Sequence, residues 1–457
     1  MAKILCITTG LTGILNASFE LMGRLETMGH NVTASCPADV QNKVNLQGFQ
    51  YMQLSPVNYN PAPAIPTYRG RLRKVKRFAH KLTHARVRRQ QALTALGMDA
   101  FLEQVFEFKP DLVIVDVELH EHIMALYSQG FNLLLLSQWF SVTDSKGLPP
   151  IQSDIIPGNG LQGSDSGMRS KWRQVRRNRW WMFVKKKLNT VYTDRRSILQ
   201  KYAKSVGFPA KFIQKNYWPG PFVYEGLPVI SMTAETLEFN HEKPLGLSYI
   251  GPMVSANRTE TQVNNDLQEQ LESIFAKKQS SDRKLIYCSV STFSLGDTSF
   301  LKRVVESVKS HENWLLIISL GGKIEVDALG DLPENVFAFP RVPQLKVLKE
   351  ANLSINHGGI HTINECLHFR TPMLIYSGKK SDQNGCAARV HFYGVGLMAD
   401  KDEDGPEDIT RKISEMLYAR DIAARIDELM LPYTNRFTHL EDVLNKQGIV
   451  SAKPVSL

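Results

Sequence analysis

Two histidines and two glycines stand together in the sequence N-H-G-G-I-H-T-I-N-E, which begins at Asn356. Residues 353–355 before it have the character of a buried strand, and residues 363–369 after it have helical spacing. A glycine turn between a strand and a helix lets a phosphate approach the backbone, and the N–H groups at the helix start favour its negative charge. These residues therefore predict a phosphate site, with His357 and the Thr362 hydroxyl as further donors.

Carboxylates with suitable spacing follow this turn. Glu365 lies three residues beyond Thr362, about one helical turn further on, where it can accept hydrogen bonds from two ribose hydroxyls. Asp382 and Gln383 are adjacent, and an acceptor beside a donor/acceptor suits the vicinal hydroxyls of a sugar. The alternative for Glu365 is an ordinary acid on a helix surface, so the surrounding sequence has to decide between the two.

The whole string from Arg341 to Val390 resembles the donor-binding signature of family 1 glycosyltransferases, the UDP-glycosyltransferase-like enzymes that move a sugar from a nucleotide diphosphate sugar to an acceptor. Pro343-Gln344, the H-x-G-x-H-T-x-x-E string, Pro372 and Asp382-Gln383 occur in the order of that signature. The resemblance implies the GT-B fold, an α/β protein in which two Rossmann-like domains with parallel sheets face a central cleft. It implies donor-binding roles for Thr292, Arg341, Val342, Gln344, His357, Gly359, His361, Thr362, Glu365, Asp382 and Gln383.

The resemblance also implies a reaction. The family transfers a hexose with inversion, without a metal and without a cofactor beyond the nucleotide sugar, for which a UDP-sugar is expected here. Its general base is a histidine in the loop after the first strand, and this sequence has Ile14 at that place. Asp116 resembles the aspartate that partners this histidine, so Asp116, Glu118 and His120 are the candidate catalytic residues. A catalytically impaired sugar-nucleotide-binding protein and a nucleotide-sugar epimerase stay open as alternatives.

The order of elements fits this arrangement. Residues 3–9 and 32–35 have the character of strands on either side of a helical segment at 15–28, which is the usual entry to a doubly wound sheet. The carboxyl ends of such strands face the ligand crevice, where 112–117 would place the candidate catalytic residues. We expect an acceptor-binding domain at 1–254, a linker at 255–281, a nucleotide-sugar-binding domain at 282–430, and a last segment at 431–457 whose helix crosses back to the first domain.

Aromatic residues follow the buried strand predicted at residues 131–136. Trp139 and Phe140 stand just beyond its carboxyl end, where they would line an acceptor pocket, although core packing explains them equally well. An aromatic lining favours a hydrophobic small molecule or a lipid as the acceptor.

The net charge of +10 comes from two basic insertions. Residues 69–89 hold ten Lys and Arg and residues 171–187 hold eight, and neither stretch contains an acid. The first has the spacing of an amphipathic helix, and the second contains Trp172, Trp180 and Trp181. Both suit an anionic membrane surface, while plain surface or packed helices are the simpler alternatives. No nucleic-acid module accompanies them, so no nucleic acid is expected as a partner.

The remaining composition is that of an ordinary globular protein. The five cysteines have no zinc-site or Cys-x-x-Cys spacing, which favours reduced thiols in a cytosol. The first residues predict a strand rather than a signal peptide, and no apolar run is long enough to span a membrane. We therefore expect a cytoplasmic protein that is peripheral on the inner face of a membrane if the basic insertions bind lipid.

Overall fold

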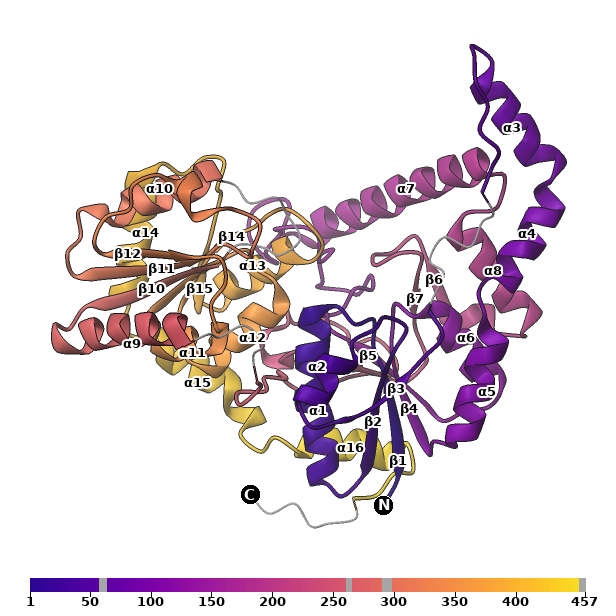
Figure 1. The fold of residues 1–457 in the computed structure, drawn as a ribbon, viewed down its shortest axis with the longest axis horizontal. Coiled ribbons are helices and arrows are strands. Elements are labelled where there is room, and N and C mark those ends of the chain that lie inside the picture. Colours follow the sequence, from indigo (N-terminus) through magenta and orange to yellow (C-terminus); the bar gives the residue numbers. More distant parts are fainter. Residues whose placement is uncertain (57–63, 260–264, 290–297, 452–457) are drawn as a thin grey trace.

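The structure is a computed structural model of the 457-residue chain and describes residues 1–56, 64–259, 265–289 and 298–451. Two parallel sheets, each flanked by helices, form two domains that lie side by side (Figure 1). The predicted α/β class with two Rossmann-like domains is confirmed.

The N-terminal sheet has seven parallel strands in the order β3-β2-β1-β4-β5-β8-β9. The sequences L-V-I-V-D and L-L-L-L-S of β4 and β5 are buried throughout, because strands inside a parallel sheet are covered on both faces. Its strands are β1 (Lys3–Ile7), β2 (Asn31–Cys36), β3 (Gln50–Gln53), β4 (Leu112–Asp116), β5 (Leu133–Ser137), β8 (Val229–Ser231) and β9 (Leu247–Tyr249).

The helices of this domain include the two basic insertions. The stretch at 69–89, expected as one helix, forms the two helices α3 and α4, which meet at His84. The stretch at 171–187 lies within the single long helix α7, which begins where Ser164 Oγ accepts a hydrogen bond from the Gly167 N–H. The helices are α1 (Thr12–Thr27), α2 (Gln41–Leu46), α3 (Arg73–Thr83), α4 (Ala85–Thr94), α5 (Met98–Phe108), α6 (His120–Ser128), α7 (Asp165–Thr190) and α8 (Arg195–Ser205), followed by the hairpin of β6 (Ile213–Lys215) and β7 (Phe222–Tyr224).

The C-terminal sheet has six parallel strands in the order β12-β11-β10-β13-β14-β15. The strand order reverses between β10 and β13, as it does between β1 and β4 in the first sheet, and a ligand crevice lies beyond the carboxyl ends of the strands at such a point. The strands are β10 (Lys284–Ser289), β11 (Trp314–Ser319), β12 (Val336–Phe339), β13 (Leu353–Asn356), β14 (Met373–Tyr376) and β15 (Gly396–Ala399).

Two helices show where the chain passes between the domains. The stretch expected as a linker contains α9, whose Leu271, Ile274 and Phe275 are buried in the core of the C-terminal domain. The last helix, α16, packs Leu440 and Leu444 into the N-terminal core (Figure 1). The helices of this half are α9 (Asn265–Ser280), α10 (Thr298–Lys309), α11 (Gln344–Glu350), α12 (Ile360–His368), α13 (Gln383–Phe392), α14 (Pro406–Tyr418), α15 (Ile422–Met430) and α16 (Thr438–Lys446).

Candidate active site

The predicted glycine turn lies between β13 and α12, at the point where the C-terminal strand order reverses. Asn356 Oδ1 accepts a hydrogen bond of 2.9 Å from the Gly358 N–H, which fixes the turn. Gly358 has a φ of +79°, and a Cβ at this position would lie 3.0 Å from the Gln383 carbonyl oxygen. No side chain caps the start of α12 at Gly359. The first N–H groups of α12 are therefore available to an anionic ligand.

Two histidines flank this helix start. His357 lies before it, and the Nδ1 atoms of both His357 and His361 are enclosed without a hydrogen-bond partner. Burial lowers the pKa of His357 to about 4, and burial together with the nearby Arg258 charge lowers the pKa of His361 to about 4. Both imidazoles are therefore neutral at pH 7. His357 can donate its one N–H to a phosphate oxygen, while the N–H of His361 lies at Nε2, 2.9 Å from the Gln138 Oε1 acceptor.

The predicted ribose ligands lie together one turn further along α12. Gln344 Nε2 donates to Glu365 Oε2 at 2.5 Å and lies 3.5 Å from the Thr362 hydroxyl. Arg258 Nη1 pairs with Glu365 Oε1 at 2.6 Å, and both of these side chains are less than one tenth exposed. The carboxylate thus has a partner on each oxygen, and this restricts its orientation at the floor of the crevice.

Two of the remaining predicted donor residues, Arg341 and Val342, directly precede the turn into α11. Arg341 is exposed, and its guanidinium packs against Gly322, where a Cβ would come within 2.9 Å of Nε. Val342 is half-buried next to it. Thr292 lies outside the residues that the structure describes.

Asp382 and Gln383 bond within their own loop at the start of α13. Gln383 Oε1 accepts from the Gly378 N–H at 3.0 Å, and Asp382 Oδ2 lies 3.5 Å from the Cys386 thiol, which donates to it. Burial raises the pKa of Asp382. Lys379 and Ser381 have positive φ values of 56° and 55°, so the loop between Gly378 and Asp382 is tightly folded. A sugar reaching this loop would replace these internal contacts.

Two segments of the N-terminal domain lie against His361, which follows the glycine turn. Gln138 directly follows β5, and its Oε1 atom lies 2.9 Å from His361 Nε2. Gly13, in the first turn of α1, lies so close that a Cβ there would be 2.7 Å from His361 Cδ2. Ile14 is 1% exposed and belongs to the N-terminal core. The position implied for the general base is thus occupied by a core residue.

The three candidate catalytic residues have different surroundings. Asp116 ends β4 and accepts a 2.8 Å hydrogen bond from the Glu118 N–H. Burial and then the Glu118 charge raise the pKa of Asp116 to about 8, and burial raises the pKa of Glu118. His120 is 1% exposed, its Nδ1 lies 2.9 Å from the Tyr224 hydroxyl, and burial lowers its pKa to about 3. The carboxyl groups of Asp116 and Glu118 thus interact with each other at the carboxyl end of β4. His120 is buried and contacts the Tyr224 hydroxyl.

An apolar pocket lies beyond the carboxyl ends of β4 and β5. Trp139 and Phe140 are among its lining residues and also belong to the buried core, so acceptor binding by them stays a prediction. Phe222 and Tyr224 of β7 form another part of the wall, with Pro219 before them. The cavity volume of the pocket is about 50 Å³, which is room for a few water-sized groups, so an acceptor would have to displace side chains of the wall. Such a lining suits a hydrophobic molecule with few polar groups.

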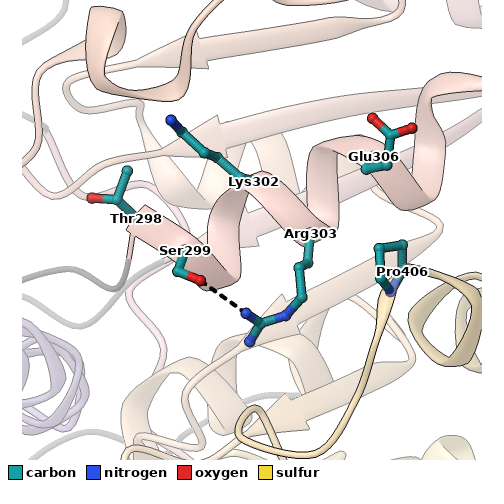
Figure 2. Close-up of a pocket in the computed structure, with 6 residues that line it drawn as sticks. All are labelled: Thr298, Ser299, Lys302, Arg303, Glu306 and Pro406. Atoms are coloured by element: carbon teal, nitrogen blue, oxygen red, sulfur yellow. Dashed lines mark hydrogen bonds between the residues drawn. The ribbon is translucent and has the colours of Figure 1, made fainter.

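A second hollow lies on the C-terminal domain between α10 and the start of α14 (Figure 2). Arg303 Nη1 donates to Ser299 Oγ at 3.0 Å across its floor. None of the predicted site residues lines this hollow, so the site described above lies elsewhere. Its lining residues are Thr298, Ser299, Lys302, Arg303, Glu306 and Pro406.

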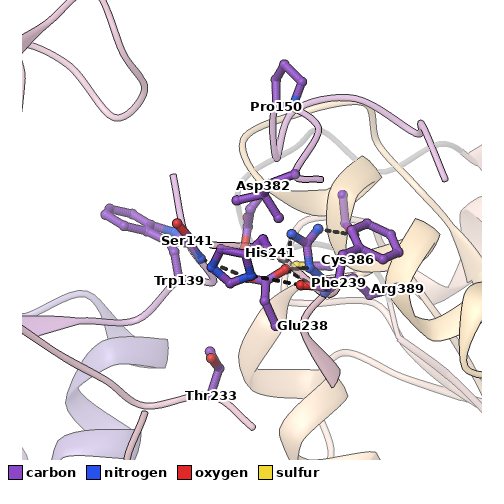
Figure 3. A network of polar contacts seen from close by, with 12 residues as sticks. Trp139, Ser141, Pro150, Thr233, Glu238, Phe239, His241, Asp382, Cys386 and Arg389 are labelled. Atoms are coloured by element: carbon purple, nitrogen blue, oxygen red, sulfur yellow. Dashed lines mark hydrogen bonds and ion pairs between the residues drawn. The ribbon is translucent and has the colours of Figure 1, made fainter. Parts of the chain in front are cut away.

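A buried polar network connects the apolar pocket with α13 (Figure 3). Arg389 of α13 forms an ion pair with Glu238 of the N-terminal domain. Its guanidinium carbon also lies 4.8 Å from the ring centre of Phe140. Glu238 Oε2 accepts from the Ser141 N–H at 2.9 Å. The network therefore fixes the pocket loop relative to the helix that begins after Asp382.

Several of these residues could not be found from the signature. Arg258, Gln138 and Glu238 lie far from the signature in sequence and reach it only through the packing of the two domains. Arg389 had a recognisable signal, because it stands alone among small and apolar residues in the helix C-A-A-R-V. A charge in such a place needs a buried partner.

In the part of the chain that the structure describes, no group of three or more His, Cys, Asp or Glu side chains is arranged to hold a metal ion. No described helix has both the length and the apolar character required to cross a bilayer.

Two facing Rossmann-like domains with a glycine-turn site on the second define a GT-B protein, as predicted. Solved structures show the same architecture over almost the whole chain. The glycotransferase of kitacinnamycin has a TM-score of 0.65 at 18% identity and covers 98% of each chain. Glycosyltransferase VinC, solved in complex with DTDP, has a TM-score of 0.59 at 16% identity and covers 98% of this chain and 99% of its own.

Residues 321–431 match the model of the glycosyltransferase family 28 C-terminal domain. An uncharacterized UDP-glucosyltransferase, YojK of Bacillus subtilis (strain 168), is 29% identical over 181 residues, which are 40% of this chain and 41% of the relative. Zeaxanthin glucosyltransferase of Pantoea ananas is 27% identical over 126 residues, 27% of this chain and 28% of the relative. These matches span less than half of the relatives' length. The resemblance to UDP-glycosyltransferase-like glycosyltransferases predicted from the sequence is confirmed.

Proposed function

We propose that this protein is a glycosyltransferase that moves a hexose from a UDP-sugar to a hydroxyl of a hydrophobic small molecule or lipid. The observation that carries the proposal is the convergence of His357, His361 and Glu365 around the uncapped start of α12, opposite the N-terminal domain. The N–H groups and the neutral His357 suit a diphosphate, Glu365 suits a ribose, and the apolar pocket suits the acceptor.

The proposed reaction is a single displacement with inversion. The acceptor oxygen attacks the anomeric carbon, its new bond to that carbon forms, and the bond from that carbon to the diphosphate oxygen breaks. The leaving diphosphate is stabilised by the N–H groups of α12, by His357 and by the positive charge of Arg258, which lies near His361. Fixed protein groups thus carry the role that a metal ion has in other transferases, and the proposed reaction is metal-independent.

We propose Asp116 as the group that takes the acceptor's proton. It ends β4 at the reversal of strand order, beside the β1 strand whose loop meets His361. Its raised pKa, about 8, makes it a stronger base than an ordinary aspartate once it is ionised. Glu118 and His120 remain the other predictions, and Asp116→Asn, Glu118→Gln and His120→Phe assign the role by which of them removes turnover while donor binding persists.

A second candidate function is sugar-nucleotide binding without transfer. The observation that favours it is Ile14, which is packed in the core where the resemblance implies a general base. Calorimetry with UDP-glucose together with a broad acceptor panel separates the two functions. Product analysis without any acceptor separates transfer from epimerisation.

The test of the donor site is His357→Ala, measured by calorimetry with UDP-glucose and by transfer or hydrolysis of the sugar. Loss of one donor to the leaving group lowers turnover by about 10²-fold. His391→Ala, on the exposed last turn of α13, is the matched control and leaves both quantities unchanged. Donor affinity and turnover that stay unchanged in His357→Ala contradict the proposal.

We also propose that the protein acts as a peripheral protein at the cytoplasmic face of a membrane. The proposal is supported by α3 and α7, which are rich in Lys and Arg and expose aromatic side chains.

A further inference from the structure

Helix α3 has an apolar face that nothing in the described chain covers. None of its residues is buried. Val75, Phe78 and Leu82 recur at intervals of three and four residues, with Leu72 directly before the helix, and they are between 45% and 64% exposed. These side chains therefore form one stripe along the helix.

The rest of α3 is basic. Its polar face carries Lys and Arg and no acid. A solvated surface helix has no reason to expose a continuous apolar stripe, because this stripe stays in contact with water. An amphipathic helix with a cationic polar face is typical of helices that lie in the interfacial region of a bilayer. The basic residues of α3 are Arg73, Lys74, Lys76, Arg77 and Lys81.

Helix α7 has a fixed first half and an exposed second half. Trp172 is buried, and its Nε1 donates to the Leu148 carbonyl at 2.7 Å. Further on, Trp180, Trp181 and Met182 are 46%, 59% and 50% exposed. Three consecutive lysines follow at 185–187. Exposed tryptophans beside lysines match the polar boundary of a bilayer, where an indole has both apolar and hydrogen-bonding surroundings.

The two helices are joined at their ends. Lys81 Nζ of α3 donates to the Asn189 carbonyl of α7 at 2.6 Å. Figure 1 shows α3 and α4 standing beside the far end of α7, at the side of the molecule away from the C-terminal domain. The two helices therefore meet at one edge of the N-terminal domain.

We propose that α3 and the second half of α7 form a docking surface for a lipid bilayer that contains anionic lipids. The basic residues attract the headgroups, and Phe78, Trp180 and Trp181 enter the interface. Charge alone would also suit a nucleic acid. The apolar stripe favours lipid, because a phosphate backbone offers nothing for it to bury against.

Docking would place the bilayer near the acceptor pocket, a consequence that rests on the proposed function. Arg176, in the middle of α7, forms an ion pair with Asp144 and lies near the Tyr217 hydroxyl. Asp144 directly follows Thr143, which lines the apolar pocket. Helix α7 thus leads from the rim of the pocket to the proposed membrane surface, so a membrane-resident lipid with a free hydroxyl is the acceptor class that fits this arrangement.

The test is flotation of the full-length protein with phosphatidylcholine vesicles that contain or lack phosphatidylglycerol, without donor or acceptor. We expect binding to the anionic vesicles, and weaker binding at high salt, because salt screens the headgroup charges. Lys74→Glu/Lys76→Glu lowers binding at least about tenfold, since each basic residue near the surface contributes to the attraction. Phe78→Ser/Leu82→Ser also lowers it. Neither pair touches buried residues, so the protein stays folded.

The matched control is Lys302→Glu/Lys309→Glu on α10 of the other domain, where both lysines are exposed, and its vesicle binding stays unchanged. Equal loss in this control overturns the proposal, as does an absence of binding to anionic vesicles. Tighter binding to duplex DNA that is insensitive to Phe78→Ser/Leu82→Ser also overturns it. Because UDP binding is measured separately by calorimetry, a failure of docking is distinguishable from a failure of the proposed function.

Discussion

Arg389 and Glu238 form an ion pair between the two domains in which neither side chain is exposed by more than 1%. Arg389 Nε donates to Glu238 Oε1 at 2.7 Å, and its Nη1 donates to the Gly385 carbonyl at 2.9 Å. The second oxygen of Glu238 accepts from the Tyr249 hydroxyl at 3.2 Å. Every charged group in the pair therefore has partners, and the pair fixes the relative position of the N-terminal and C-terminal domains.

Replacing Arg389 should destabilise the protein strongly. Arg389→Leu leaves the Glu238 carboxylate buried without its cation, which costs about 3–5 kcal/mol of unfolding free energy. Urea unfolding of the wild type and of Arg389→Leu measures this loss of unfolding free energy. Arg411→Ala removes an exposed pair with Asp408 and serves as the control, with a cost below about 1 kcal/mol. If both substitutions lower the unfolding free energy by the same amount, the ion pair does not stabilise the arrangement of the two domains.

Arg258 should matter for turnover more than its place outside the signature suggests. It pairs with Glu365 and lies near His361, so its positive charge lies beside the start of α12, where we propose that the leaving diphosphate binds. We expect Arg258→Ala to lower turnover about 10²-fold and Arg258→Lys to recover part of it. Calorimetry with UDP and steady-state kinetics measure both variants. Arg420→Ala, an exposed arginine of the C-terminal domain, is the control, and an Arg258→Ala enzyme as active as this control refutes the role.

The donor half of the site was predictable because its chemistry is local. The strand, glycine turn and helix from Leu353 to His368 are neighbours in sequence, so spacing alone brings His357 and Glu365 to one helix start. The sheets were predictable for a similar reason, since apolar runs such as β4 and β5 have few alternatives in an α/β chain.

The contacts between the domains were not predictable, because they depend on how two independently folded surfaces meet. Gln138 and His361 are 223 residues apart, and nothing in either segment specifies the other. The single helix expected at 69–89 ends early for a local reason. At the junction of α3 and α4 the His84 backbone leaves helical geometry, with φ −104° and ψ 12°, and its ring lies near the hydroxyl of Thr83.

Gly13 should be required for the closed arrangement of the cleft. A Cβ at Gly13 would lie 2.7 Å from His361 Cδ2, so Gly13→Ala must displace the ring and weaken its contact with Gln138. We expect turnover to fall about tenfold, with UDP affinity almost unchanged because the backbone of the turn stays in place. Gly23→Ala in the same helix is the control, since its Cβ would meet only Phe49 Cζ at 3.9 Å. Equal turnover in the two variants contradicts this role.

The buried Asp116 carboxyl should make the folded protein less stable as the pH rises towards 8. Its folded pKa is about 8, raised mainly by burial, while in the unfolded chain an aspartate has a pKa near 3.9. Between these values Asp116 carries one proton more in the folded state than in the unfolded state, so its contribution to the unfolding free energy falls by about 1.4 kcal/mol per pH unit. Asp116→Asn removes this dependence, and urea unfolding at several pH values measures it.

Comparison of the wild type with Asp116→Asn isolates the effect of Asp116. Burial also lowers the pKa values of His120 and His122 to about 3 and those of His357 and His361 to about 4, and these histidines add stability equally in both variants as the unfolded histidines lose their protons around pH 6.5. The buried cysteines contribute only above about pH 8.5, where unfolded thiols ionise. Asp331→Asn, at an exposed position, is the control and keeps the wild-type slope of stability against pH.

If Asp116 takes the acceptor's proton, kcat/KM should rise about tenfold per pH unit up to about pH 8, since only the ionised carboxylate can accept it. A rate that is level between pH 6 and 8, with the stability slope still present, would assign the proton to another group and leave Asp116 a structural role.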